Sequence, residues 1–191
     1  SYYYLDKKNK ISIESKNINS KALIENLCMA IKIALDLGIK KEIIKKTIPK
    51  ITITGRVQYL KQGKLKRILK KGEKLLIDGC HSEKSSQNLY SYLKTLKEPI
   101  YGIWGMQKNK DPEKFLKSFK GIFKKIVTVK IPNHENALNA EELKKISVKN
   151  KHQTEIANNV EDAIKKCSTK EKKTIAIFGS LYLVGEVLNK K

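Results

Sequence analysis

Residues 75–82 read Leu75-Leu76-Ile77-Asp78-Gly79-Cys80-His81-Ser82, a short apolar run that ends abruptly in Asp, Gly and His. Such a run is typical of a buried parallel strand whose carboxyl end opens into a site. In open α/β sheets, ligands bind just beyond the carboxyl ends of the strands. Asp78 carries two acceptor oxygens, which suit sugar hydroxyls. We therefore predict a ligand site at residues 78–81.

From residue 74 onward, apolar segments alternate with amphipathic segments. Strands are predicted at 74–78, 100–106, 126–131 and 174–178, with a weaker one at 153–157. Helices are predicted at 84–97, 112–121, 140–147, 160–167 and 181–189, with N-caps at Asp111, Asn139 and Asn159. This alternation indicates βαβ units with right-handed crossovers. The predicted fold class is α/β, with a mostly parallel sheet flanked by helices.

The first 49 residues follow a different pattern. Residues 10–13 alternate like the end of a strand, and Ser20 is placed to cap a helix over 21–37. A short helix over 41–47 is followed by Pro49, and no separate sheet is expected here. We therefore divide the chain into a small helical remnant at 1–49 and an α/β domain at 50–191, whose first residues form a junction that contains Arg56.

The formal net charge of +22 raises the question of nucleic-acid binding. Of the 41 basic residues only Arg56 and Arg67 are arginine, and the lysines are spread along the whole chain. Basic residues do not cluster with aromatic ones, and no helix-turn-helix or zinc spacing is present. The lysines are therefore expected on solvated faces. A basic module that binds nucleic acid is kept as the alternative function.

Composition also bears on the compartment. No run approaches the ~18 apolar residues of a membrane helix, so no membrane partner is expected. Cys28, Cys80 and Cys167 are odd in number and far apart, which fits reduced thiols in a cytoplasm rather than disulfides or a zinc site. The chain starts at Ser1 without an initiator Met, and we expect it to begin within a longer protein.

Further candidates follow the other predicted strands. Ser180 comes directly after strand 174–178, where the bare amides of a helix N-terminus attract a carboxylate or phosphate. The alternative is that Ser180 only caps this helix. Lys110 lies in the loop after the strand at 100–106 and could reach a phosphate, although a solvated loop is equally consistent with its sequence. No motif supports a role for His134 or His152.

Several kinds of site are excluded by the motifs that the chain lacks. It contains no Gly-x-x-x-x-Gly-Lys-Ser/Thr loop, so it cannot cradle a triphosphate alone, and no Gly-x-Gly-x-x-Gly follows a strand. No paired carboxylates or His/Asp metal cluster stand out, and Cys80 has no partners of a catalytic triad. We expect no catalytic group and no metal site in this chain.

Four motifs together resemble one known family. They are Gly55-Arg56-Val57-Gln58, Ile77-Asp78-Gly79-Cys80-His81-Ser82, Gly105-Met106-Gln107-Lys108-Asn109-Lys110-Asp111 and Phe178-Gly179-Ser180-Leu181-Tyr182-Leu183-Val184-Gly185. Their order and spacing over residues 50–188 are similar to the C-terminal part of folylpolyglutamate synthase/dihydrofolate synthase, in the Mur ligase superfamily. Residues 1–49 resemble the last helices of that family's central ATPase domain.

The resemblance implies a Rossmann-like domain and an ATP-dependent amide ligase. In this family ATP phosphorylates a folate carboxylate, and the amino group of glutamate attacks the acyl phosphate. The matching positions imply ATP contacts for Arg56 and Asp78 and glutamate contacts for His81 and Ser180, with Lys110 as a lesser candidate. Where the family has asparagine after this histidine, the chain has Ser82.

The same resemblance implies the partners. The P-loop and the magnesium ligands of the family lie in its central domain, so ATP and Mg²⁺ would be bound mainly outside this chain. The expected partners are an N-terminal P-loop ATPase domain, a folate or pteroate and L-glutamate. We expect a cytoplasmic monomer that is inactive alone. A Mur-type ligase with another acceptor is a further alternative.

Overall fold

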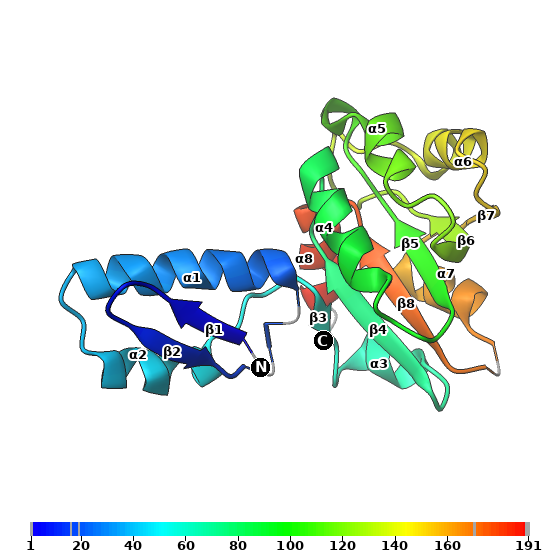
Figure 1. Ribbon diagram of the computed structural model, residues 1–191. Coiled ribbons are helices and arrows are strands. Elements are labelled where there is room, and N and C mark those ends of the chain that lie inside the picture. Colours follow the sequence, from blue (N-terminus) through cyan, green and yellow to red (C-terminus); the bar gives the residue numbers. More distant parts are fainter. Residues whose placement is uncertain (1, 16, 19, 170, 190–191) are drawn as a thin grey trace. The chain divides into compact units, whose positions relative to one another are not determined.

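The computed structural model describes residues 2–15, 17–18, 20–169 and 171–189. It contains two compact units, Ser1–Thr54 and Gly55–Lys191, which are treated separately below (Figure 1).

The second unit is built on one six-stranded sheet with the order β3-β4-β8-β5-β6-β7. The short edge strand β3 (Gln58–Tyr59) runs antiparallel to β4 (Glu73–Asp78). All other neighbours are parallel, namely β8 (Lys173–Phe178), β5 (Ile100–Trp104), β6 (Phe123–Thr128) and β7 (Thr154–Ile156). The α/β prediction with a mostly parallel sheet is therefore confirmed.

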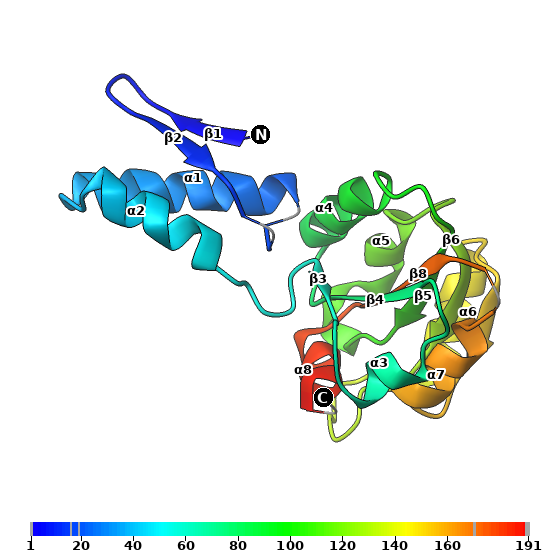
Figure 2. The same cartoon turned by 90° about the horizontal axis from the view of Figure 1, so that it is seen from below.

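Helices cover both faces of this sheet (Figure 2). Residues of α4 (Glu83–Leu93), α5 (Pro112–Lys117) and α6 (Ala140–Lys149) belong to one apolar core. Residues of α3 (Lys64–Ile68), α7 (Val160–Cys167) and α8 (Leu181–Asn189) belong to the other. Strand β8 is buried at every position, as the central strand of a sheet covered on both faces must be.

The predicted caps are present. Asp111 accepts a hydrogen bond from the Lys114 amide at 3.3 Å. Asn139 forms a capping box with Glu142, and Asn159 accepts from the Asp162 amide. The predicted helices at 84–97 and 112–121 are too long, because α4 ends at Leu93 and α5 at Lys117 in tight turns. The strand predicted at 126–131 is displaced, because β6 spans Phe123–Thr128 and the Phe123 ring stacks on Phe178 with 5.0 Å between centroids.

The first unit has a small core of its own. It contains β1 (Tyr2–Leu5), β2 (Lys10–Ile13), α1 (Lys21–Asp36), α2 (Lys41–Thr47) and a single 3-10 turn at Ile48–Lys50. Ser20 caps α1, as predicted. The two strands pair as an antiparallel hairpin, whereas the sequence predicted helices and no separate sheet. The turn depends on Asp6, which accepts hydrogen bonds from the amides of Lys8 and Asn9 at 2.8 Å.

Gly185, inside α8 of the second unit, tests whether the helix has free space at this position. A Cβ at Gly185 would meet no atom within 4 Å. Glycine inside a helix loses more backbone entropy on folding than alanine, so Gly185→Ala should raise the free energy of unfolding by about 0.5–1 kcal/mol. Urea unfolding followed by circular dichroism measures this change. A lower midpoint would show that position 185 is more crowded than the structure indicates.

Candidate functional site

The candidate site lies at the carboxyl ends of three neighbouring strands. Asp78 of β4 and Trp104 of β5 both stand beside Phe178 of β8 in the parallel register. The turns that begin at Gly79 and Gly179 therefore leave the same edge of the sheet. The predicted meeting of the strand ends near positions 78 and 180 is confirmed by this register.

Asp78 is almost completely buried, with 5% of its surface exposed. Its Oδ2 accepts the Val57 amide at 2.9 Å and its Oδ1 accepts the Cys80 amide at 2.8 Å. Burial raises the pKa of this carboxyl, while the two amide hydrogen bonds and the charge of Arg56 oppose the rise. The carboxylate thus joins the 55–57 turn to the end of β4. From the sequence we predicted that the Asp78 oxygens accept hydrogen bonds from a ligand, whereas in the structure both accept backbone amides. A contact between Asp78 and a nucleotide remains a prediction.

The turn that carries Arg56 is held in an unusual conformation. Val57 has a φ of 44°, which is rare for a β-branched residue. The hydrogen bond from the Val57 backbone N–H to Asp78 Oδ2 holds this conformation, and the Gly79 amide donates to the Gly55 carbonyl at 2.8 Å. Arg56 is half-buried, and a Cβ on Gly79 would lie 2.7 Å from its Nη1. The structure therefore brings Arg56 and Asp78 to one place.

His81 follows on the same turn. Its Nδ1 lies 2.9 Å from the Gly79 carbonyl, which can only accept, so Nδ1 carries the hydrogen and a neutral ring presents Nε2 as an acceptor. Ser82 is the N-cap of α4 and forms a capping box with Ser85. Serine at the family's asparagine position therefore caps α4 as asparagine would.

Ser180 is 1% exposed and directly precedes α8. Its Oγ accepts the Tyr182 amide at 3.1 Å, and its carbonyl accepts the Val184 amide. Ser180 is thus a cap, which is the alternative that the sequence left open, and its role toward glutamate remains a prediction. Leu181 packs over the β4 turn, since a Cβ on Gly79 would lie 2.3 Å from its Cδ2.

Lys110 lies in the 3-10 turn Lys108–Lys110, where its backbone amide donates a hydrogen bond to the Gln107 carbonyl. Within the described ranges, no carboxylate lies within the ion-pairing distance of 4.0 Å from its ammonium group. The structure also shows no side-chain hydrogen bond between Lys110 and Asp78, His81 or Ser180, three residues that it describes. Its membership of the site remains a prediction.

Three residues at this edge had no predicted role. Gln107 Nε2 lies 3.2 Å from His134 Nε2, and the His134 ring meets the Tyr182 ring edge-on at 4.2 Å between centroids. Gln107 and Tyr182 were within recognised motifs, but His134 lies in a polar loop of the sequence. Nothing local could have connected His134 with Tyr182, because they are far apart in the chain.

Metal binding and thiol chemistry receive no support from the described residues. Among the residues that the structure describes, no group of three His, Cys, Asp or Glu side chains could hold a metal ion. Burial raises the pKa of the Cys80 thiol well above its usual range and that of Cys167 to about 12, so neither is an activated nucleophile.

No helix in the described part of the chain has the length and apolar character that crossing a bilayer requires.

The buried Asp78 carboxylate gives a direct test of how the site is held. In Asp78→Asn an NH₂ group replaces one acceptor, which leaves the amide of Val57 or Cys80 unpaired. The free energy of unfolding should fall by about 1–3 kcal/mol. Denaturant unfolding measures this loss. The matched control is Glu113→Gln, which removes an exposed pair with Lys149 and should change stability by less than about 0.5 kcal/mol. Equal effects would contradict the assignment.

Comparison with known proteins decides the family. A family model for the C-terminal domain of dihydrofolate synthetase matches residues 61–190. The chain belongs to this family. The resemblance drawn from its motifs is confirmed, and the fold carries those motifs at the expected sheet edge. A sequence comparison with curated proteins finds no match.

Solved structures show the same fold. Folylpolyglutamate synthase from Mycobacterium tuberculosis, complexed with ADP and AMPPCP, matches 95% of the chain with a TM-score of 0.80 and 17% identity. The enzyme from Thermotoga maritima matches 95% with a TM-score of 0.74 and 23% identity. The bifunctional folylpolyglutamate synthase/dihydrofolate synthase from Yersinia pestis, complexed with AMPPNP and Mn ion, matches 98% with a TM-score of 0.78 and 15% identity. The chain covers 42%, 41% and 43% of these chains, about two fifths of their length.

Proposed function

We propose that the chain is the C-terminal lobe of an ATP-dependent ligase that adds L-glutamate to the carboxylate of a folate or pteroate. The observation that carries this proposal is the parallel pairing of β4 with β8, which brings the turn of Arg56 and Asp78 to the same sheet edge as Ser180. Membership of the dihydrofolate synthetase family supports the reaction class.

Each residue has a role that its chemistry fits. Arg56 offers a planar, permanently charged fork for ATP phosphates, and Asp78 fixes the turn that presents it. Lys110 is a second cation for phosphate. Ser180 and the first amides of α8 suit a carboxylate of glutamate, with His81 Nε2 as a neighbouring polar group.

In the proposed reaction, ATP transfers its γ-phosphoryl group to the acceptor carboxylate and leaves as ADP. The glutamate nitrogen then attacks the acyl phosphate, the C–O bond to phosphate breaks, and the nitrogen loses a proton. This chain would bind and orient the two substrates. In this proposal the P-loop and the Mg²⁺ ligands would belong to a separate ATPase domain.

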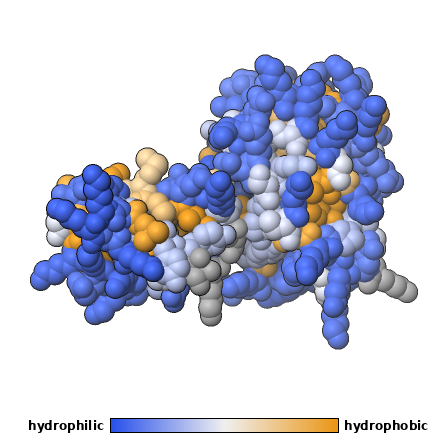
Figure 3. Space-filling model, viewed as in Figure 1, coloured by the Kyte–Doolittle hydropathy of each residue, from blue (hydrophilic) through white to orange (hydrophobic). Residues whose placement is uncertain are grey.

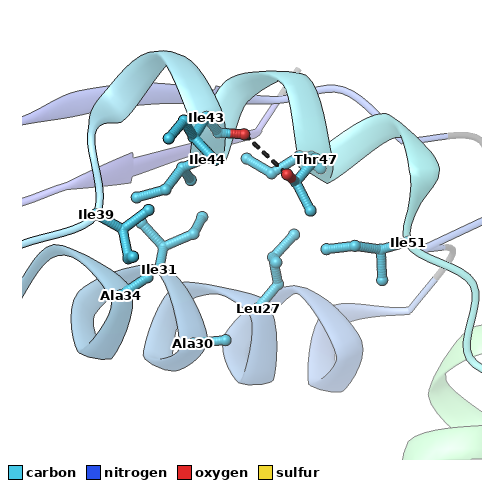
Figure 4. A pocket seen from close by; sticks show the side chains of 10 residues that line it. Leu27, Ala30, Ile31, Ala34, Ile39, Ile43, Ile44, Thr47 and Ile51 are labelled. Carbon is cyan, nitrogen blue, oxygen red and sulfur yellow. Dashed lines mark hydrogen bonds between the residues drawn. The ribbon is translucent and has the colours of Figure 1, made fainter. Parts of the chain in front are cut away.

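The first unit supports the existence of such a partner domain. An apolar groove of about 220 Å³ lies between α1 and α2, lined by Leu27, Ile31, Ile44 and neighbouring aliphatic residues (Figure 4). Thr47 donates to the Ile43 carbonyl within α2, so its hydroxyl does not make the groove polar. Large apolar side chains on the same unit are exposed, namely Met29, Ile33, Leu37, Ile39 and Ile43. We propose that residues 1–49 complete an ATPase domain that covers this apolar surface, and that residues 50–191 form the C-terminal lobe.

The lysine content is consistent with solvated faces. On the face drawn in Figure 3, hydrophilic residues cover much of the second unit rather than one stripe. A nucleic-acid site would instead require a focused basic surface.

The experiment that tests the proposal joins this chain to a P-loop ATPase domain of the family and measures ligation. Product should form only when ATP, L-glutamate and dihydropteroate or a reduced folate are all present. The isolated chain serves as the control and should form none. A joined protein that is folded, as circular dichroism and a cooperative melt would show, yet makes no amide with either acceptor would reject the proposed function.

A further inference from the structure

The loops after β5 and β6 meet the start of α8 at the proposed site. Gln107 follows β5, His134 follows β6, and Tyr182 lies in the first turn of α8, two residues after Ser180. Gln107 Nε2 is 3.2 Å from His134 Nε2, and the rings of His134 and Tyr182 are T-shaped at 4.2 Å between centroids. Side chains from three separate segments therefore form one connected group.

Backbone hydrogen bonds fix the two loops to each other. Gln107 pairs with Ala137 in an isolated antiparallel bridge, and the Lys108 amide donates to the Asn136 carbonyl at 2.9 Å. The Leu138 amide donates a hydrogen bond to the Met106 carbonyl at 3.0 Å. Because these bonds connect residues 106–108 to 136–138, the position of His134 is set by the sheet edge rather than by a free loop.

The contact with Gln107 orients the His134 ring. Gln107 Nε2 can only donate, so His134 Nε2 accepts and the hydrogen of a neutral ring is on Nδ1. This Nδ1 is buried and has no partner among the described residues. Burial of such a donor is unfavourable for folding. The contact that this orientation supplies is the edge of the His134 ring against Tyr182.

Tyr182 is the exposed member of the group, with 59% of its surface accessible. An aromatic side chain supported from behind and open in front is a common wall of a ligand site, because its face packs on methylene groups and its hydroxyl bonds to polar ends. Trp104 Nε1, close to Gly179, is also buried without a partner in the described ranges. The third such atom, His152 Nε2, precedes β7 and lies at the opposite edge of the sheet.

We propose that Tyr182 forms the wall of the amino-acid subsite at Ser180 and selects the length of the incoming amino acid. The ring face would contact the two methylene groups of glutamate, and the hydroxyl would bond to its distal carboxylate. His134 and Gln107 are positioning residues that act through Tyr182. This inference rests on the proposed function, since it assigns the specificity of the same site.

The test is steady-state ligation by the joined protein with L-glutamate and with L-aspartate, which is one methylene shorter. Tyr182→Ala should raise KM for glutamate about 10-fold and reduce the preference for glutamate, with kcat and KM for ATP within about 2-fold. His134→Ala should act in the same direction. His134→Phe should keep most of the wild-type KM for glutamate and most of the preference for glutamate, because it retains a ring edge against Tyr182. His152→Leu, at the opposite edge, is the matched control and should leave the preference unchanged.

The outcomes separate this inference from the proposed function. If Ser180→Ala raises KM for glutamate but Tyr182→Ala changes neither KM nor preference, the wall assignment is wrong while the glutamate site stands. If Ser180→Ala also leaves KM unchanged, the proposed glutamate site itself fails. His134→Ala could instead lower the melting temperature and raise the KM values for glutamate and for ATP equally. If His134→Phe then restores neither KM value, His134 is structural and its positioning role is rejected.

Discussion

Replacement of Arg56 by alanine should lower kcat/KM for ATP-dependent ligation by about 100-fold to 1,000-fold in the joined protein, the range expected when a fixed donor to developing charge is lost. The guanidinium is half-buried beside the Asp78–Gly79 turn and carries a permanent charge. Its turn is fixed by Asp78, so little reorganisation is needed to bind phosphate. Initial rates at varied ATP concentrations measure the effect.

Two further variants make the Arg56 test specific. Arg67→Ala removes the only other arginine of the chain, in α3, and should leave kcat/KM within about 2-fold. Arg56→Lys keeps the charge but loses the bidentate fork, so it should recover only part of the activity. An unchanged rate for folded Arg56→Ala would remove this residue from the site.

Gly179→Ala should lower the free energy of unfolding by at least about 3 kcal/mol, because backbone strain and a steric clash add at this position. Gly179 has a φ of +107°, and a Cβ there would lie 2.6 Å from both the Gly105 carbonyl oxygen and Trp104 Cδ1. Neither the strand backbone nor a fully buried indole can move away easily. Urea unfolding of the full chain measures the loss.

Gly121→Ala is the matched control for Gly179→Ala. Gly121 also has a positive φ, +75°, but a Cβ there would meet nothing within 4 Å. Gly121→Ala introduces backbone strain without a clash, so it should lower the free energy of unfolding by only about 1–2 kcal/mol. If the two variants cost the same, the close approach of Gly179 to β5 contributes nothing, and the tight packing of the strand ends would be contradicted.

Local patterns predicted most of the α/β domain. The strands at 74–78 and 174–178 were found within one residue of β4 and β8, because continuous apolar runs bounded by glycine have few other solutions. The caps at Ser20, Asp111, Asn139 and Asn159 were also correct, since capping depends on residues two or three positions apart.

The errors fall where local signals are weak. β3 has two residues and α3 has five, so neither shows a clear periodicity. The hairpin of the first unit was missed because Tyr2–Leu5 does not alternate between polar and apolar residues. Its turn is stabilised by side-chain hydrogen bonds to Asp6, which a search for Gly-rich turns does not detect.

The order of strands and helices, the glycines that end the strands and the family motifs can all be recognised in the sequence, because each depends on residues that are close neighbours in the chain. The meeting of Asp78 with Val57, and of His134 with Gln107 and Tyr182, depends on which strands lie side by side. Strand order is set by packing over the whole sheet, so these contacts between distant segments arise only on folding. For the same reason, the sequence placed Asp78 at the site but could not show that backbone amides occupy both of its oxygens.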